Sequence, residues 1–252
     1  MGLTLSAGAL RERGIWYYPC AGSKGFGELR VCCACFGPLP VTILLFDFDG
    51  TLADTLPTVI AISNRLAPQY GYAPTTPAEV EQLRNTSSRD ILRSSRVARW
   101  HVPCLLWRLS RELRSELASI GWIPGIQPAL VQLQQDHHLL GIVTSNSARN
   151  VQQFLGDRQG DQYFSVVKAG VSILGKQRVL KRLLWKHNWN PSQVLYIGDE
   201  VRDIEAARAA GVRSGAVTWG FNTQAVLYAA QPDFLLEEPQ QLLGVARSLK
   251  AV

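Results

Sequence analysis

Residues 43–55 of this chain read Ile-Leu-Leu-Phe-Asp-Phe-Asp-Gly-Thr-Leu-Ala-Asp-Thr. The apolar run 43–46 stops at two carboxylates, Asp47 and Asp49, which are separated by one residue. If the run is a buried strand, it must end where Asp47 begins, because an ionised carboxylate cannot be left unpaired in a core. Both acids then leave the strand end on the same side, since side chains alternate along a strand. Gly50 allows a sharp turn after them, and Thr51 can bond locally.

Two like charges this close repel each other unless a cation or a proton intervenes. A hard divalent cation such as Mg²⁺ is one remedy, and a protonated general acid beside an ionised nucleophile is the other. Two other readings are a structural turn after a strand and a fragment of a calcium loop. The calcium loop is disfavoured because such loops end in an acid, and the corresponding position holds Thr58.

The rest of the chain alternates apolar runs with helical patterns. The runs predicted to be strands lie near residues 42–46, 139–143, 164–167, 194–197, 214–218 and 233–236. This alternation predicts an α/β fold with a doubly wound parallel sheet covered by helices on both faces. Ligands of such sheets bind beyond the carboxyl ends of the strands, so polar residues that follow several strands are expected to converge on one site.

Two further strands end in polar residues. Leu139–Val143 is followed by Thr144, Ser145 and Asn146, and residues 147–155 read as a helix whose N-terminal amides favour an anion. Thr-Ser-Asn is also an ordinary helix N-cap sequence.

The run 194–197 is followed by Gly198, Asp199 and, four residues later, Asp203. If a helix begins near Glu200, the two aspartates can approach the same ion from the strand end and the first helical turn. Acids also favour helix N-termini. This preference explains the position of Glu200 but not that of Asp199.

Taken in order, these segments resemble the motifs of the haloacid dehalogenase superfamily, specifically its phosphatase branch. Asp47 to Thr55 resembles motif I, Thr144 stands at the motif II position, and Val194 to Asp203 resembles motif IV. Motif III supplies a lysine, for which Gly175-Lys176 at the start of a basic helix fits best. Lys168 is the competitor and Lys181 a weaker one. The resemblance covers residues 41–250 and implies a Rossmann-like core with a small helical cap inserted after the first strand.

The resemblance also implies roles for the residues. Asp47 attacks the phosphorus of a phosphomonoester and forms an aspartyl phosphate, while Asp49 protonates the leaving oxygen and then activates water. Lys176 neutralises the charge of the nucleophile and of the phosphoryl group. Thr144 and the backbone amides of Ser145 and Asn146 hold the phosphoryl oxygens. The implied cofactor is Mg²⁺, and its implied binding set is Asp47, Phe48 through its carbonyl, Asp49, Asp199 and, as a ligand or in support, Asp203.

Within the superfamily the residues also distinguish between the activities that its members have. Dehalogenases lack the second acid of motif I and need no metal, and transport ATPases carry lysine where this chain has Phe48. The segment 211–221 resembles phosphoglycolate phosphatases most closely, so phosphoglycolate is the first candidate substrate. A sugar phosphomutase shares both acids and stays an alternative. A noncatalytic protein that binds a phosphorylated ligand is a further alternative, although it predicts a damaged motif and all four are intact.

Residues 57–120 show helical patterns and several arginines without strand signals. In the family this insertion is the cap, which implies a core domain made of 41–56 and 121–252. Arg84, Arg89 and Arg93 are candidates for contact with an anionic substrate. Of these we predict Arg89 as a substrate-binding residue. Arginines on amphipathic helices also form ordinary solvated faces.

Composition sets limits on partners and location. The 252 residues carry a formal net charge of +6, but the basic residues are spread and no nucleic-acid module is present. We therefore expect a small phosphorylated metabolite as the partner and neither nucleic acid nor membrane. Residues 41–252 hold one cysteine, Cys104, as expected of the cytoplasm, while the other four lie in the first 40 residues without a zinc-site spacing.

The first 40 residues match no element of this scheme, and they lack the apolar core and cleavage site of a signal peptide. We expect them to be a disordered extension or to be absent from the natural protein, with translation beginning at Val41. Measuring the intact mass of the natural protein tests this hypothesis.

Overall fold

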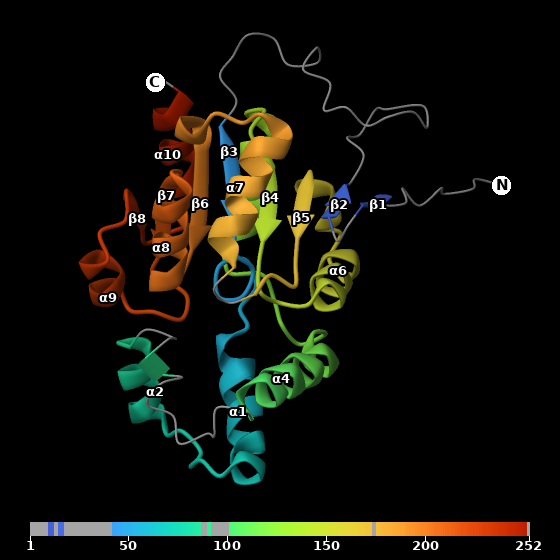
Figure 1. The fold of residues 1–252 in the computed structure, drawn as a ribbon, viewed down its shortest axis with the longest axis vertical. Helices are drawn as coiled ribbons and strands as arrows, with labels where there is room; N and C mark the ends of the chain where they lie inside the picture. The colour runs from blue at the N-terminus through green and yellow to red at the C-terminus, as the bar shows by residue number, and fades with distance from the viewer. Residues whose placement is uncertain are drawn as a thin grey trace, which may run out of the picture.

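The computed structural model describes residues 10–12, 15–17, 42–86, 90–91, 101–172 and 175–250. Its centre is a parallel sheet of six strands with helices on both faces, which confirms the predicted doubly wound α/β fold (Figure 1). The parallel strands are β3 (Ile43–Phe46), β4 (Leu139–Val143), β5 (Val166–Lys168), β6 (Val194–Gly198), β7 (Arg213–Val217) and β8 (Phe234–Leu236).

The sheet places the end of β3 where the strand order reverses. β3 pairs with β4 on one side and with β6 on the other, in the order β5-β4-β3-β6-β7-β8. The chain therefore fills one half of the sheet before it crosses back to fill the other. A crevice at the carboxyl ends of β3 and β6 is the expected ligand site of such a sheet.

Successive residues of β3 point to opposite faces, as the alternation of side chains requires. Leu44 and Phe46 pack in the cluster that includes residues of α5 (Ile126–Gln135), α6 (Ala148–Asp157) and α10 (Gln241–Lys250). Ile43 and Leu45 pack in the cluster that includes residues of α7 (Lys176–His187) and α8 (Val201–Ala210). All four side chains are buried, so β3 is held from both sides.

A short helix, α9 (Gln224–Ala229), precedes β8.

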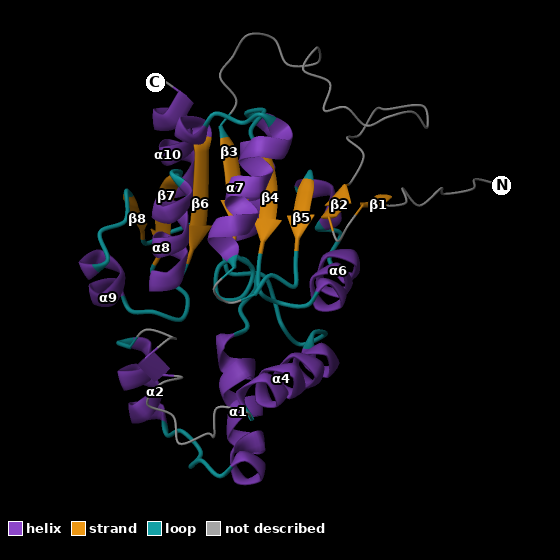
Figure 2. Ribbon diagram, viewed as in Figure 1, coloured by secondary structure: helices purple, strands orange, loops and turns teal. Residues whose placement is uncertain are grey.

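Between β3 and α5 the chain forms helices that lie beyond the carboxyl ends of the strands (Figures 1 and 2). Their bounds are Leu56–Tyr70 for α1, Pro77–Arg84 for α2 and Val102–Glu116 for α4. α1 packs along α4, and the Arg65 guanidinium bridges the two helices through Glu112 (2.9 Å) and Glu116 (3.3 Å). The helices occupy the place expected of a cap, and the bounds of that domain stay a prediction.

Two short strands extend the sheet beyond β5. β1 (Leu10–Glu12) pairs with β2 (Ile15–Tyr17), and β2 pairs antiparallel with β5. Strands of three residues are too short to give a sequence signal, and the nature of the extension as a whole stays a prediction. The other residues of the first 40, with four cysteines, lie outside the described part of the chain. Among the described residues, no helix is long and apolar enough to cross a membrane.

Candidate active site

Asp47 lies directly after β3, and its position is fixed by main-chain and side-chain contacts. Its amide donates to the carbonyl oxygen of Ile197 (2.7 Å), which extends the pairing with β6 by one residue. One carboxylate oxygen, Oδ1, accepts from the amide of Phe48 (2.8 Å), and the other, Oδ2, accepts from Lys176 Nζ (2.6 Å). The side chain is 2% exposed. Asp47 is therefore a buried carboxylate held in one orientation, as a nucleophile requires.

Lys176 joins two acids that lie far apart in the sequence. Its ammonium donates to Asp203 Oδ1 (2.6 Å) as well as to Asp47. Burial by itself would lower the pKa of Lys176, but the Asp203 and Asp47 carboxylates outweigh it and raise that pKa. Burial would raise the pKa of Asp47, but Lys176 and then Arg202 outweigh it and lower that pKa. The pair is thus held in its ionised form.

Lys168, the alternative motif III lysine, has different surroundings. Burial, followed by the charges of Arg182 and Lys186, lowers the pKa of Lys168. The contacts of Lys176 with both acids favour it for the motif III role.

Asp199 and Asp203 complete a cluster of carboxylates with Asp47. One oxygen from each of the three lies within 4.8 Å of the other two, and all three residues are buried. Burial, followed by the charges of Glu200, Asp47 and Asp203, raises the pKa of Asp199 well above its usual range. Carboxylates that disfavour one another's charge in this way are stabilised by a further cation, and oxygen donors suit a hard ion such as Mg²⁺. The residues present therefore fit the expected metal.

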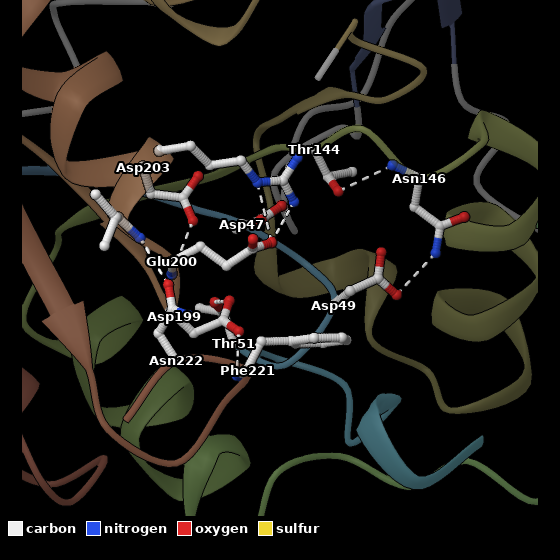
Figure 3. Close-up of polar contacts among 12 residues, drawn as sticks. Asp47, Asp49, Thr51, Thr144, Asn146, Asp199, Glu200, Asp203, Phe221 and Asn222 are labelled. Atoms are coloured by element: carbon white, nitrogen blue, oxygen red, sulfur yellow. Dashed lines mark hydrogen bonds and ion pairs between the residues drawn. The ribbon is translucent and has the colours of Figure 1, made fainter. Parts of the chain in front are cut away.

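The position of Asp199 is fixed by groups from two distant loops. Thr51 Oγ1 donates to Asp199 Oδ1 (2.8 Å), and the amide of Phe221 donates to Oδ2 (2.7 Å; Figure 3). Gly50 and Gly220 make this approach possible: a Cβ atom would lie 2.4 Å from Asp199 Oδ2 at Gly50 and 2.3 Å from it at Gly220. Gly50 also has a φ of +69°, which glycine adopts without strain.

Asp49 points away from the carboxylate cluster (Figure 3). Its Oδ1 accepts from Asn146 Nδ2 (2.9 Å). Burial, followed by the charge of Asp47, raises the pKa of Asp49 to about 7. A carboxyl with this pKa can give up and take back a proton near neutral pH, as a general acid and base does.

The Phe48 carbonyl, expected to be a metal ligand, faces a different partner. It accepts from the amides of Leu52 and Ala53, each at 3.0 Å, within the turn after Asp49. These two bonds use both lone pairs of a carbonyl oxygen. Phe48 as a metal ligand stays a prediction of the resemblance. The Asp49 side chain is bound to Asn146 rather than to the cluster, so the described acids that cluster are Asp47, Asp199 and Asp203.

The expected phosphoryl-binding residues follow β4 as predicted. Thr144 is fully buried, and its hydroxyl oxygen accepts from the amide of Asn146 (3.1 Å), so that amide already has a partner. The Asn146 side chain holds Asp49 instead. Ser145 is half-buried beside them. Arg89, the expected substrate-binding arginine, lies outside the described residues.

Sequence reasoning missed several residues of the site. Thr51, expected to bond locally, bonds to Asp199, which lies 148 positions further along the chain. Arg202 Nε donates to Glu200 Oε1 (2.9 Å), and Tyr196 donates to Asp203 Oδ1 (3.3 Å). The charge of Arg202 within the acid-rich motif IV could have marked it as a neutralising group.

Arg84 joins the inserted helices to the core. Its guanidinium donates to the carbonyl oxygens of Gly220 (3.1 Å) and Phe221 (3.3 Å), and its own carbonyl accepts from Asn222 Nδ2 (3.1 Å). Arg84 was a candidate for contact with an anionic substrate. These contacts instead fasten α2 to the loop that positions Asp199.

The fold and the site geometry define an α/β protein with a buried carboxylate cluster at the point where the strand order of its sheet reverses. A family model described as haloacid dehalogenase-like hydrolase matches residues 44–217. Since this match spans more than half of the chain, the protein belongs to the haloacid dehalogenase-like hydrolases, as its motifs predicted.

Individual relatives agree with this assignment. The chain is 47% identical to the phosphoglycolate phosphatase of Synechococcus elongatus over 207 residues, which are 82% of this chain and 97% of that protein. It is 28% identical to the phosphoglycolate phosphatase of Vibrio cholerae, over 81% of this chain and 96% of that protein. These matches confirm the prediction of an enzyme of the phosphatase type within the family.

A solved structure shows the same fold. The haloacid dehalogenase-like hydrolase of Streptococcus pneumoniae superposes with a TM-score of 0.68 at 22% identity, covering 82% of this chain and 98% of that one.

Proposed function

We propose that this protein is a Mg²⁺-dependent phosphomonoester hydrolase that acts through an aspartyl phosphate, with phosphoglycolate as the first candidate substrate. The observation that carries the proposal is the buried Asp47 carboxylate, held by Lys176 at 2.6 Å, with the second acid, Asp49, two residues away. One acid is thereby kept ionised for attack, while the other has a pKa of about 7 and can transfer a proton.

In the first step, a carboxylate oxygen of Asp47 attacks the phosphorus, and the bond from phosphorus to the ester oxygen breaks. Asp49 gives its proton to that leaving oxygen, so the product departs as a neutral alcohol. In the second step, Asp49 takes a proton from water, and the resulting hydroxide oxygen displaces Asp47 from phosphorus. Inorganic phosphate leaves, and both acids return to their starting states.

Lys176 and Thr144 support these steps. The Lys176 ammonium offsets the charge of Asp47 before attack and of the phosphoryl group afterwards. The Thr144 hydroxyl accepts from the Asn146 amide and keeps its own proton available for a phosphoryl oxygen. Asp47, Asp199 and Asp203 would hold Mg²⁺, which when bound supplies positive charge that polarises the phosphoryl group.

Two observations support phosphoglycolate. Curated relatives that match over four fifths of this chain carry that activity in their names. The segment 211–221 resembles the same enzymes, and the structure places its end, Phe221, against Asp199. We further propose a cytoplasmic location, which is supported by the single cysteine, Cys104, in residues 41–252.

The experiment is phosphate release by the full chain with Mg²⁺ from a panel of phosphomonoesters that includes phosphoglycolate, with Asp47→Asn as the control. We expect wild-type turnover, highest on phosphoglycolate, and its loss both in Asp47→Asn and in EDTA. A sugar phosphomutase would convert a hexose phosphate into its isomer without releasing phosphate. A protein that only binds phosphorylated ligands would release none from any ester while staying folded.

A further inference from the structure

Asn150 lies in the first turn of α6 and contacts Asn146, whose side chain holds Asp49. It is fully buried, and its side chain contacts two elements. Asn150 Nδ2 donates to Asn146 Oδ1 (3.0 Å) and to the carbonyl oxygen of Ser110 in α4 (2.9 Å). Asn150 Oδ1 accepts from Arg114 Nε, also in α4 (3.1 Å). A buried amide whose donor and acceptor sides both have partners is fixed in one orientation.

These contacts form a line from the inserted helices to Asp49. Arg114 can only donate, so it requires the Asn150 oxygen to face α4. The Asn150 nitrogen then faces Asn146, whose oxygen also accepts from the amide of Ser147 (2.7 Å). With its oxygen bound by two donors, Asn146 must present its nitrogen to Asp49, as it does at 2.9 Å.

We propose that Asn150 and Arg114 are positioning residues that hold the Asn146 amide toward Asp49, so that the proton donor is aligned when α4 lies against α6. The inference rests on the proposed function, because it concerns the proton transfer by Asp49. It gives an arginine of the inserted helices a role that is neither substrate contact nor a solvated face.

The alignment matters most where the leaving oxygen needs a proton. General acid catalysis accelerates the departure of a basic oxygen and does little for a leaving group that is already stable as an anion. Phenyl phosphate and p-nitrophenyl phosphate share one ring, but phenolate is the poorer leaving group. The value of kcat/KM reports only the steps up to departure of the alcohol, and so it excludes the later hydrolysis step in which Asp49 acts as a base.

The experiment measures kcat/KM of the full chain with Mg²⁺ for both aryl esters in wild type, Asn150→Ala and Arg114→Met. We expect Asn150→Ala to lower kcat/KM for phenyl phosphate by about tenfold or more and that for p-nitrophenyl phosphate by about threefold or less, since general acids contribute ~10²–10⁴-fold and only alignment is lost. Arg114→Met is expected to show the same skew with smaller size. The double variant is expected to equal Asn150→Ala, because the two residues act in one line.

Arg111→Met is the matched control. Arg111 is an exposed residue of the same helix and contacts the Trp107 ring at 5.5 Å. We expect both ester rates of this variant to stay at the wild-type level. Arg114 is only half-buried, so Arg114→Met tests the inference even if Asn150→Ala does not fold.

Equal losses on the two esters in Asn150→Ala and Arg114→Met would overturn the inference and leave the proposed function standing, because such losses indicate general disturbance of the site. Wild-type protein that is folded but hydrolyses neither the two aryl esters nor phosphoglycolate would overturn both the inference and the proposed function. If Arg111→Met also loses more kcat/KM for phenyl phosphate than for p-nitrophenyl phosphate, the effect is not specific to Asn150 and Arg114, and the inference is overturned.

Discussion

Replacing Lys176 with methionine removes the ammonium but keeps most of the length and packing of the side chain. Asp47 and Asp203, which are 2% and 1% exposed and each 2.6 Å from Nζ, then lose their shared cation. Breaking a buried ion pair by removing one partner costs about 3–5 kcal/mol, since a buried charge is left uncompensated. At about 2–4 °C per kcal/mol for a chain of this size, the metal-free variant is expected to melt about 6–20 °C below wild type.

The assay is thermal unfolding of the full chain in EDTA, followed by circular dichroism, with Lys181→Met as the matched control. Lys181 is an exposed residue of the same helix, so its replacement is expected to change stability by about 0.5 kcal/mol or less. The loss in Lys176→Met should shrink as pH falls, because the abandoned carboxylates can take up protons, and should shrink on adding Mg²⁺. Equal melting temperatures of the two variants in EDTA at neutral pH would refute the reasoning.

Three further predictions follow from the same site. Because the pKa of Asp49 rises from 3.8 to about 7 on folding, the unfolded chain releases this proton first, so metal-free wild type should lose stability as pH rises from about 4 to about 7. Asp49→Asn should flatten that loss, and parallel curves of melting temperature against pH would contradict it. Gly220→Ala, whose Cβ would lie 2.3 Å from Asp199, should weaken Mg²⁺-dependent turnover. Gly244→Ala should not, because a Cβ atom there meets no atom within 4 Å. Saturating Mg²⁺, at ~100 times its Kd, should stabilise wild type by about 2.7 kcal/mol, and Asp199→Asn should abolish most of this shift in a thermal titration.

Local patterns along the chain were enough to predict the sheet and the place of the site within it. Apolar runs such as 43–46 and 194–197 stop at acids, and a buried strand has to end where an ionised group begins. Because the carboxyl ends of parallel strands lie at one edge of the sheet, the meeting of Asp47 with Asp199 could be predicted from their places after strands. The four-residue spacing of Asp199 and Asp203 likewise predicted their approach.

The hydrogen-bond partner of each polar group, by contrast, depends on how the whole chain packs. Lys176 reaches Asp47 across 129 positions of sequence and Thr51 reaches Asp199 across 148. The local pattern favoured Lys176 over Lys168, but it could not show which acids Lys176 contacts, and no local pattern gave Thr51 its partner. The contact of Asn150 with α4 depends in the same way on how the inserted helices lie against α6. Hydrophobic periodicity is a local property that the chain carries in its sequence, whereas hydrogen-bond partners depend on distances of a few tenths of an ångström, which exist only once the helices and strands have packed.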